Sequence, residues 1–232
     1  MPIDVGAEGD VGTINEIVQT LFGQSSQTVD IVILLTILTL LPSILMMLTG
    51  FTRIIIVLSF VRQAAGLQQT PPNQILIGLA LFLTFFIMQP VISEVYEEAY
   101  VPFTEGQMEQ QEFIERSMLP IRTFMLEQVF ESDLNFFVNM SGEDYSEVDL
   151  EDIPNAVLIP AFITSEIKHA MFIGFLIYLP FIVIDMIVAS TLMAMGMMML
   201  PPAMISLPFK VLLFVMVDGW QLIIGSLFTS FL

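Results

Sequence analysis

The chain has 232 residues, of which 56% are hydrophobic and only 13% charged, about half the charged share of an ordinary soluble domain. This composition excludes a disordered chain and argues against a soluble globular enzyme. The net charge of −18 argues against a nucleic-acid partner, because its phosphates would be repelled. The chain has no cysteine, which excludes disulfides and thiolate metal sites. Its one histidine is His169, which excludes most zinc sites and catalytic triads. The sequence therefore predicts no enzymatic activity, no metal site and no cofactor.

The acidic charge is concentrated in two segments. Residues 1–30 contain 5 acidic and no basic side chains, and residues 94–155 contain 16 acidic and 2 basic ones. The rest of the chain holds 3 acidic and 4 basic residues. Polar acidic segments separated by long apolar blocks are typical of a membrane protein with sizeable parts outside the hydrocarbon layer.

The apolar blocks are long enough to cross a membrane. Residues 31–52, 63–93 and 186–209 form uncharged runs of 22, 31 and 24 residues, and a crossing helix needs about 20. We expect four apolar passes, at residues 31–61, 74–93, 156–195 and 202–231. Prolines inside them should kink or break the helices; these are Pro42, Pro90, Pro160, Pro180 and Pro208.

Two short turns, each with a Pro-Pro pair, join these passes into hairpins. Proline stops one helix and fits the first turn of the next, where its missing N–H is not needed. The expected fold is an all-α membrane protein of two helical hairpins with an acidic, largely helical extracytoplasmic insertion. The expected divisions are an N-terminal segment at 1–30, a first hairpin at 31–93, the acidic region at 94–155 and a second hairpin at 156–232.

Two features mark the acidic region. A stripe at helical spacing predicts an amphipathic helix bent at Pro120; its members are Ile114, Met118, Ile121, Met125 and Val129. The run at 141–152 has six carboxylates, and calcium binding is one interpretation. It lacks the glycine and terminal Glu pattern of a calcium-binding EF-hand, so a solvated acidic loop is favoured.

The basic residues suggest an orientation. Arg53 and Arg62 lie by the first turn, whereas residues 1–30 and 94–155 are acidic. The positive-inside rule then places both Pro-Pro turns in the cytoplasm and both acidic segments outside. Residues 1–30 lack the basic start of a signal peptide, so we expect that a signal has already been removed.

Charged residues within the apolar passes are candidate functional residues, because each costs about 2.5 to 3.5 kcal/mol on insertion scales. Asp185 and Lys210 lie at comparable distances on either side of the second turn, so antiparallel helices would bring them together as an ion pair. Separate hydration or a proton relay through Asp185 are the alternatives. The other expected buried charges are Arg53, Glu166 and Lys168.

The second turn is rich in methionine, with five in the seven residues 193–199. Thioethers are flexible and polarizable, so a ring of them could close an opening without a fixed complementary shape. Apolar packing and copper(I) coordination are the competing interpretations. The residues assigned to the seal are Met195, Met197, Met198 and Met199.

Four runs of sequence are specific rather than compositional: FTRIIIVLSFVRQA at 51–64, GLQQTPPNQ at 66–74, IDMIVAS at 184–190 and MGMMMLPP at 195–202. They resemble the FliP family of flagellar type III export-gate proteins. The resemblance implies a pentameric ring that assembles with FliQ-like, FliR-like and FlhB-like proteins in the inner membrane of the flagellar basal body. Unfolded flagellar proteins would pass through this ring.

The resemblance also implies roles for particular residues. It implies that Met197 to Met199 form a gasket at the pore constriction and that Asp185 and Lys210 matter for function. Assembled gates of this kind stand largely out of the bilayer, so the apolar passes would also bury one another. The alternatives are a stand-alone ion or copper(I) transporter and the homologous subunit of a virulence secretion system.

Overall fold

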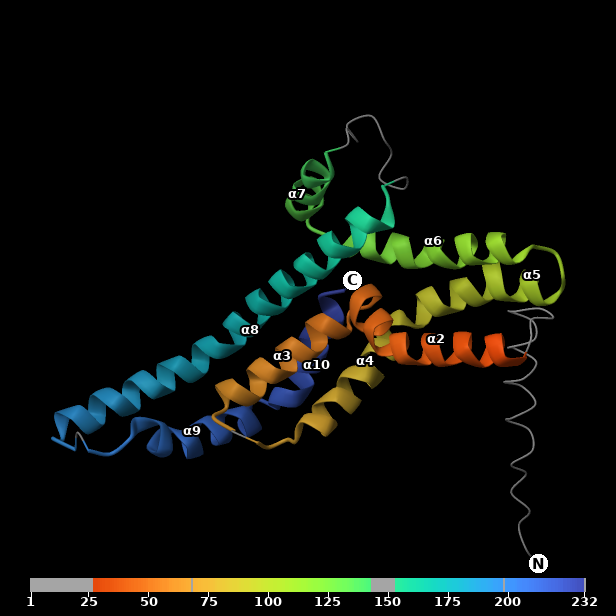
Figure 1. Cartoon of the computed structure of the whole chain (residues 1–232). Coiled ribbons are helices and arrows are strands. Elements are labelled where there is room, and N and C mark those ends of the chain that lie inside the picture. The colour runs from red at the N-terminus through yellow and green to blue at the C-terminus, as the bar shows by residue number, and fades with distance from the viewer. Residues whose placement is uncertain (1–26, 68, 143–152, 198, 232) are drawn as a thin grey trace, which may run out of the picture. The chain divides into compact units, whose positions relative to one another are not determined.

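The computed structural model describes residues 27–67, 69–142, 153–197 and 199–231, and all regular structure in these ranges is helical (Figure 1). This confirms the all-α prediction. The elements are α2 (Gln27–Leu48), α3 (Phe51–Ala64), α4 (Asn73–Val95), the π-helix η1 (Tyr96–Tyr100), α5 (Val101–Thr104), α6 (Gln110–Gln128), α7 (Glu131–Ser141), α8 (Asn155–Ala194), α9 (Pro202–Met216) and α10 (Gly219–Thr229).

The described helices provide two to four candidate membrane spans. Two are continuous, Asn73–Thr104 and Asn155–Ala194. Two more arise if bent pairs count as single spans: Pro42–Leu48 with Phe51–Ala64, bent by 88°, and Pro202–Met216 with Gly219–Thr229, bent by 64°. The four expected passes are matched only if each bent pair counts as one span, and the first and last are then each broken in two.

The sharp breaks do not coincide with prolines. Each of the five prolines expected to kink or break a pass lies inside a helix. The first break falls at Thr49 and Gly50, and the second at Val217 and Asp218, where Asp218 adopts a left-handed conformation with φ +49°. Membrane helices tolerate proline because neighbouring groups satisfy the freed carbonyls.

The chain forms two compact units, described separately. The first comprises Met1–Leu45 and Val91–Ile121, and the second Met46–Pro90 and Arg122–Leu232. In the first unit aromatic pairs hold the short helices: Tyr96 stacks on Tyr100 at 5.3 Å between ring centroids, and Phe103 on Phe113 at 4.6 Å. The second unit contains the buried apolar cluster of α3, α4, α8 and α10.

In the second unit α3 and α8 lie side by side and run in the same direction (Figure 1). Gly174 on α8 allows the close approach, because a Cβ there would lie 2.5 Å from the ring of Phe60 on α3. Since α3 and α8 are parallel, the turns that follow them lie toward the same end of this pair.

The acidic region is helical where it is described. Helix α6 confirms a helix at the predicted stripe, with Pro120 inside it. Of the predicted stripe, Met125 is fully buried and Ile114 is exposed. The carboxylates of residues 143–152, and most of the N-terminal segment, lie outside the described residues.

Candidate functional site

The methionine turn has a geometry fixed by its backbone. Gly196 adopts a left-handed conformation with φ +75° that ends α8. Its N–H donates to the carbonyl of Met193 at 3.0 Å, and the N–H of Met197 donates to Leu192 at 3.0 Å. These bonds close the helix end in the manner typical of a glycine at this position. Pro202 then starts α9 as its first residue.

The thioethers of this turn are exposed. The exposed fractions are 60% for Met195, 43% for Met197 and 98% for Met199. Met198 lies outside the described residues. Met195 also borders an apolar pocket of about 410 Å³ between α8 and α9. The exposed thioethers are therefore available for contact with other molecules.

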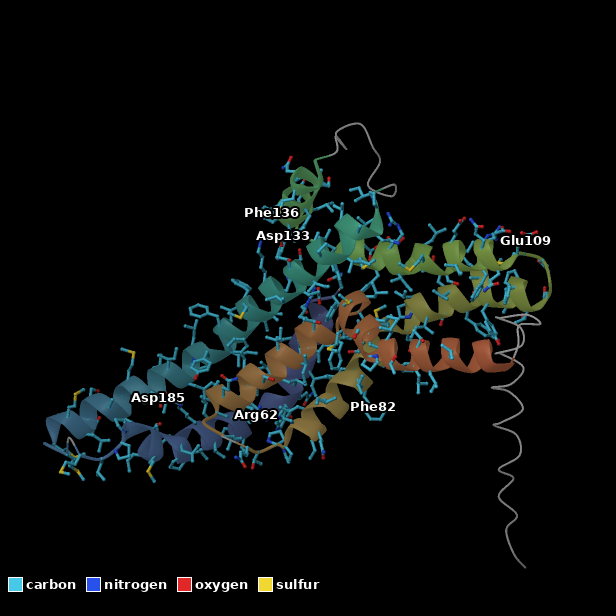
Figure 2. All side chains as sticks on the ribbon, in the orientation of Figure 1. Arg62, Phe82, Glu109, Asp133, Phe136 and Asp185 are labelled. Carbon is cyan, nitrogen blue, oxygen red and sulfur yellow. The ribbon has the colours of Figure 1, made fainter. Side chains whose placement is uncertain are left out.

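Asp185 and Lys210 are brought together across the α8–α9 hairpin. Lys210 Nζ lies 2.6 Å from Asp185 Oδ2, and the Ser206 hydroxyl donates to Asp185 Oδ1 at 2.6 Å. The Lys210 side chain is only 8% exposed, whereas that of Asp185 is 38% exposed. Figure 2 shows Asp185 on the half of α8 that lies toward the turn. The pair therefore joins the two helices that carry the methionines.

The contact of Ser206 with Asp185 was not predicted, although the spacing of Ser206 and Lys210 in the sequence indicates it. Ser206 precedes Lys210 by four residues on α9, so the two side chains lie on the same face one turn apart. Ser206 is fully buried and supplies the Asp185 carboxylate with a second donor. A carboxylate with two donors on one helix is held more firmly than a simple ion pair would hold it.

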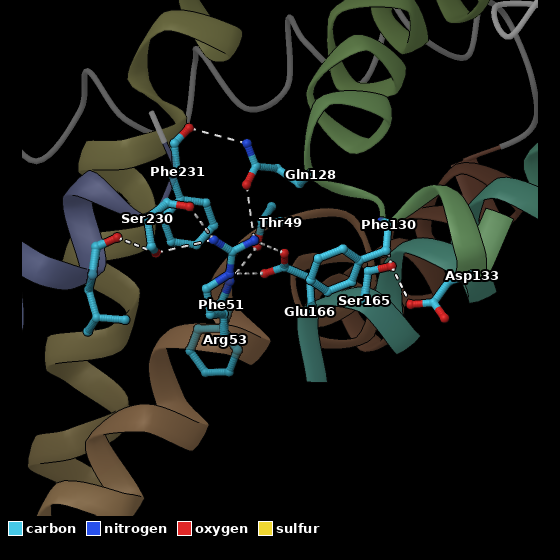
Figure 3. A network of polar contacts seen from close by, with 11 residues as sticks. Thr49, Phe51, Arg53, Gln128, Phe130, Asp133, Ser165, Glu166, Ser230 and Phe231 are labelled. Carbon is cyan, nitrogen blue, oxygen red and sulfur yellow. Dashed lines mark hydrogen bonds and ion pairs between the residues drawn. The ribbon is translucent and has the colours of Figure 1, made fainter. Parts of the chain in front are cut away.

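Arg53 and Glu166 form a fully buried ion pair at the other end of the second unit (Figure 3). Arg53 Nε donates to Glu166 Oε2 at 3.2 Å, and Nη2 donates to Glu166 Oε1. The other donors reach the Ser230 carbonyl at 2.6 Å and Gln128 Oε1 at 3.0 Å. The guanidinium carbon lies 3.9 Å from the ring centroid of Phe231. This network ties α3 to α8, to the end of α6 and to the residues after α10.

The sequence predicted Arg53 and Glu166 as buried charges but did not pair them. Both are indeed fully buried. They lie 113 residues apart, and only the packing of α3 against α8 brings them together. Gln128 and Ser230 are ordinary polar residues in sequence, and nothing in their surroundings singled them out.

The prediction that Lys168 is buried is wrong. Its side chain is 53% exposed and forms an ion pair with Asp133 of α7. Lys168 follows Glu166 by two residues, which places it about 200° around the helix and hence on the opposite face. Ser165 also binds Asp133, at 2.8 Å, and His169 stacks on the Phe130 ring with 4.1 Å between centroids. This cluster fastens α7 to α8.

A metal centre formed by the usual ligands is not found in the part of the chain that the structure describes. No group of three or more His, Cys, Asp or Glu side chains there is arranged to hold an ion. The thioethers of the methionine turn are a separate kind of ligand, suited to soft metals such as copper(I).

Comparison with known proteins identifies close relatives along most of the chain. The model of the FliP family matches residues 34–227. The flagellar biosynthetic protein FliP of Pectobacterium carotovorum subsp. carotovorum is 55% identical over 211 residues, which cover 90% of this chain and 81% of the relative. The protein of the same name from Bacillus subtilis strain 168 is 53% identical over 206 residues, or 89% and 93% of the two chains. That of Treponema pallidum strain Nichols is 50% identical over 206 residues, or 88% and 76%.

Proposed function

Because the chain belongs to the FliP family, we propose that it is the pore-forming subunit of the flagellar type III protein export gate. Family membership assigns it to the flagellar export apparatus, and its long apolar helices make it a membrane protein. The proposal adds that unfolded flagellar proteins pass through a pore that several copies of this chain line and that its methionine turn seals.

The observation that carries the proposal is the methionine turn. Met195, Met197 and Met199 are exposed on a loop in which the N–H groups of Gly196, Met197 and Leu200 donate to nearby backbone carbonyls. In a ring of copies such loops would meet at the axis. Thioethers adapt to irregular contacts, so the ring could seal against itself at rest and against a passing chain of changing shape during export. Rigid β-branched or aromatic side chains would adapt less well.

The Asp185–Lys210 pair supports this role by fixing the hairpin behind the turn. Asp185 on α8 and Lys210 on α9 are held by each other and by Ser206. A loop that must seal needs rigid supports, since a soft contact on a mobile base would leave gaps. The pair and the gasket therefore act together in the proposed mechanism.

Replacing Met197, Met198 and Met199 together with Ala should open the seal. We expect the assembled gate to leak ions and small solutes, because alanine shortens the side chains that would fill the axis. The measurement is dye or ion flux through the complex in liposomes, together with growth of cells that express it. A matched control replaces Met171, Met186 and Met216, which are exposed away from the turn, with Ala. Equal permeability of the two triple variants would contradict the proposal.

The partners in this proposal are further copies of the chain, as a pentamer, and FliQ-like, FliR-like and FlhB-like gate proteins. Supporting this, α8 exposes a large apolar surface that includes Phe172, Phe175 and Leu176. Such surfaces are covered in the native state by lipid or by other subunits. We place the complex in the bacterial inner membrane, within the flagellar basal body.

The proposed orientation has both acidic segments on the periplasmic side and both Pro-Pro turns in the cytoplasm. The chain lacks cysteine, so single cysteines are unique labels. In intact cells with a permeable outer membrane, an impermeant maleimide should label Glu109→Cys but not Gln69→Cys. Both positions are exposed, and the second should react only after the cells are lysed. Labelling of Gln69→Cys before lysis would reverse the orientation.

A further inference from the structure

Asp218 differs from the other charged residues of the apolar helices in the second unit. Across the described residues 51–64, 73–90 and 155–229, every other charged side chain has a polar partner. Asp218 has neither an ion pair nor a side-chain hydrogen bond, and it does not cap α10 although it precedes that helix. Asp218 is exposed in the single chain, and an unpaired charge in an apolar segment usually faces a cavity or a partner.

The Asp218 residue lines an apolar pocket of about 680 Å³ between α4 and α10. Phe86 and Phe228 bridge the two helices, with 5.6 Å between their ring centroids. Trp220 lines the same pocket, and its ring meets that of Phe214 edge-on at 5.3 Å. The pocket thus has aromatic walls and one carboxylate. Its volume lies in the range of sites for small ligands, roughly 300 to 1,000 Å³.

The six basic side chains of a second copy of this chain are already engaged within their own chain. The chain has six basic residues, and the structure describes all of them. Each is already engaged within its own chain: Arg53 with Glu166, Arg62 with Asn73, Arg116 with Glu112, Arg122 with the Ile153 carbonyl, Lys168 with Asp133 and Lys210 with Asp185. Asp218 therefore has no ready counterpart among the six basic side chains of a second copy, and a cation from another kind of molecule would fit it.

The size of the pocket favours a lipid over a protein helix. At a diameter of about 10 Å and a pitch of 5.4 Å, one helical turn fills roughly 420 Å³, so the pocket takes fewer than two turns. A transmembrane partner would need about 30 Å of helix. An acyl chain, in contrast, is narrow and wholly apolar. We propose that this pocket binds one phospholipid with a protonated amine headgroup, its acyl chain along the aromatic walls and its ammonium paired with Asp218.

The position of the pocket along the helices suits a lipid headgroup. Asp218 lies 16 residues after Pro202, or about 24 Å of helix from the second turn. If α9 crosses the layer by itself, with that turn at one membrane surface, Asp218 comes close to the other surface of a layer about 30 Å thick. Trp220 next to it is of the type enriched at membrane interfaces. The lipid would fill the space that the bend between α9 and α10 leaves open.

The test measures which lipids the full chain retains. The chain is reconstituted with its bound subunits into nanodiscs that contain equal amounts of phosphatidylethanolamine and phosphatidylglycerol, and is then purified from them. Native mass spectrometry of the wild type should find phosphatidylethanolamine retained at least fivefold over phosphatidylglycerol. Asp218→Asn should abolish this preference while retaining lipid, because asparagine also tolerates the left-handed conformation. Gly225→Leu should reduce total retention, since Gly225 lines the pocket and a Cβ there meets open space.

Gly78→Leu is the matched control, because a Cβ added at Gly78 on α4 would also have no neighbour within 4 Å, and Gly78 does not line the pocket. It should retain lipid as the wild type does. A photoreactive benzoylphenylalanine at Phe86 should form lipid adducts in cells. Equal retention of the two lipids by the wild type would overturn the proposal. So would a photoadduct of Phe86 with a protein subunit or with a second copy of the chain. If Gly225→Leu does not assemble, the test rests on Asp218→Asn, and a preference for phosphatidylethanolamine that persists in this variant would overturn the proposal.

Discussion

The Arg53→Met variant is expected to lose about 3 to 5 kcal/mol of unfolding free energy, because it leaves Glu166 without its ion-pair partner in a fully buried site. The variant also removes the donors that hold Gln128 and the Ser230 carbonyl. Denaturant unfolding of the detergent-solubilised protein measures the loss. Swimming in soft agar should fall with the amount of assembled protein.

Two further variants distinguish the charge from the packing. Arg53→Met combined with Glu166→Met should recover part of the stability, because no unpaired charge remains buried. Recovery should be incomplete by about 1 to 3 kcal/mol, since buried polar groups lose their donors. The control is Arg116→Met, whose exposed pair with Glu112 should contribute less than about 1 kcal/mol. Equal losses in Arg53→Met and Arg116→Met would contradict a stabilising role for the buried pair.

The second large effect is expected at the Asp185–Lys210 pair, and it should be asymmetric. Asp185→Ala leaves the ammonium of a nearly buried Lys210 unpaired, so we expect a loss of about 3 to 5 kcal/mol. Lys210→Met leaves Asp185 partly in water and still bonded to Ser206, so the loss should be nearer 1 to 3 kcal/mol. Unfolding of the purified protein and export of flagellar subunits into the medium measure both effects.

Charge reversal tests direct pairing. Asp185→Lys with Lys210→Asp should restore part of the export that either single change abolishes, since the Ser206 hydroxyl can also accept a hydrogen bond from an ammonium. Ser206→Ala should cost about 1 kcal/mol, the typical value for one hydrogen bond. If the double reversal recovers nothing and Ser206→Ala has no effect, the contact does not stabilise the hairpin.

Local features of the fold could be predicted from the sequence. Runs of apolar residues predicted the helices, and the Pro-Pro pairs predicted the turns. Asp185 and Lys210 could be matched because a hairpin fixes which residues face each other at equal distance from its turn. The breaks near Gly50 and Asp218 were not predicted. The sequence placed the kinks at prolines, but these prolines lie inside helices.

Long-range packing could not be predicted from the sequence. The pairing of Arg53 with Glu166 needs α3 and α8 to be parallel neighbours, and no local pattern specifies that. The exposure of Lys168 could have been predicted, since a residue two positions after a buried Glu166 lies on the opposite side of the helix. The pairing of Lys168 with Asp133 depends on how α7 packs against α8. The roles assigned to the gasket methionines remain predictions.

The Arg53 network has a consequence for biosynthesis. Glu166 follows Arg53 by 113 residues, and Ser230 follows it by 177. At translation speeds of about 5 to 20 residues per second, the nascent chain carries this guanidinium without its counter-ion for roughly 6 to 23 s. During that interval Arg53 is best accommodated by reaching toward the lipid headgroups. We therefore expect the segment around Arg53 to reach its final depth only after Glu166 has been synthesised.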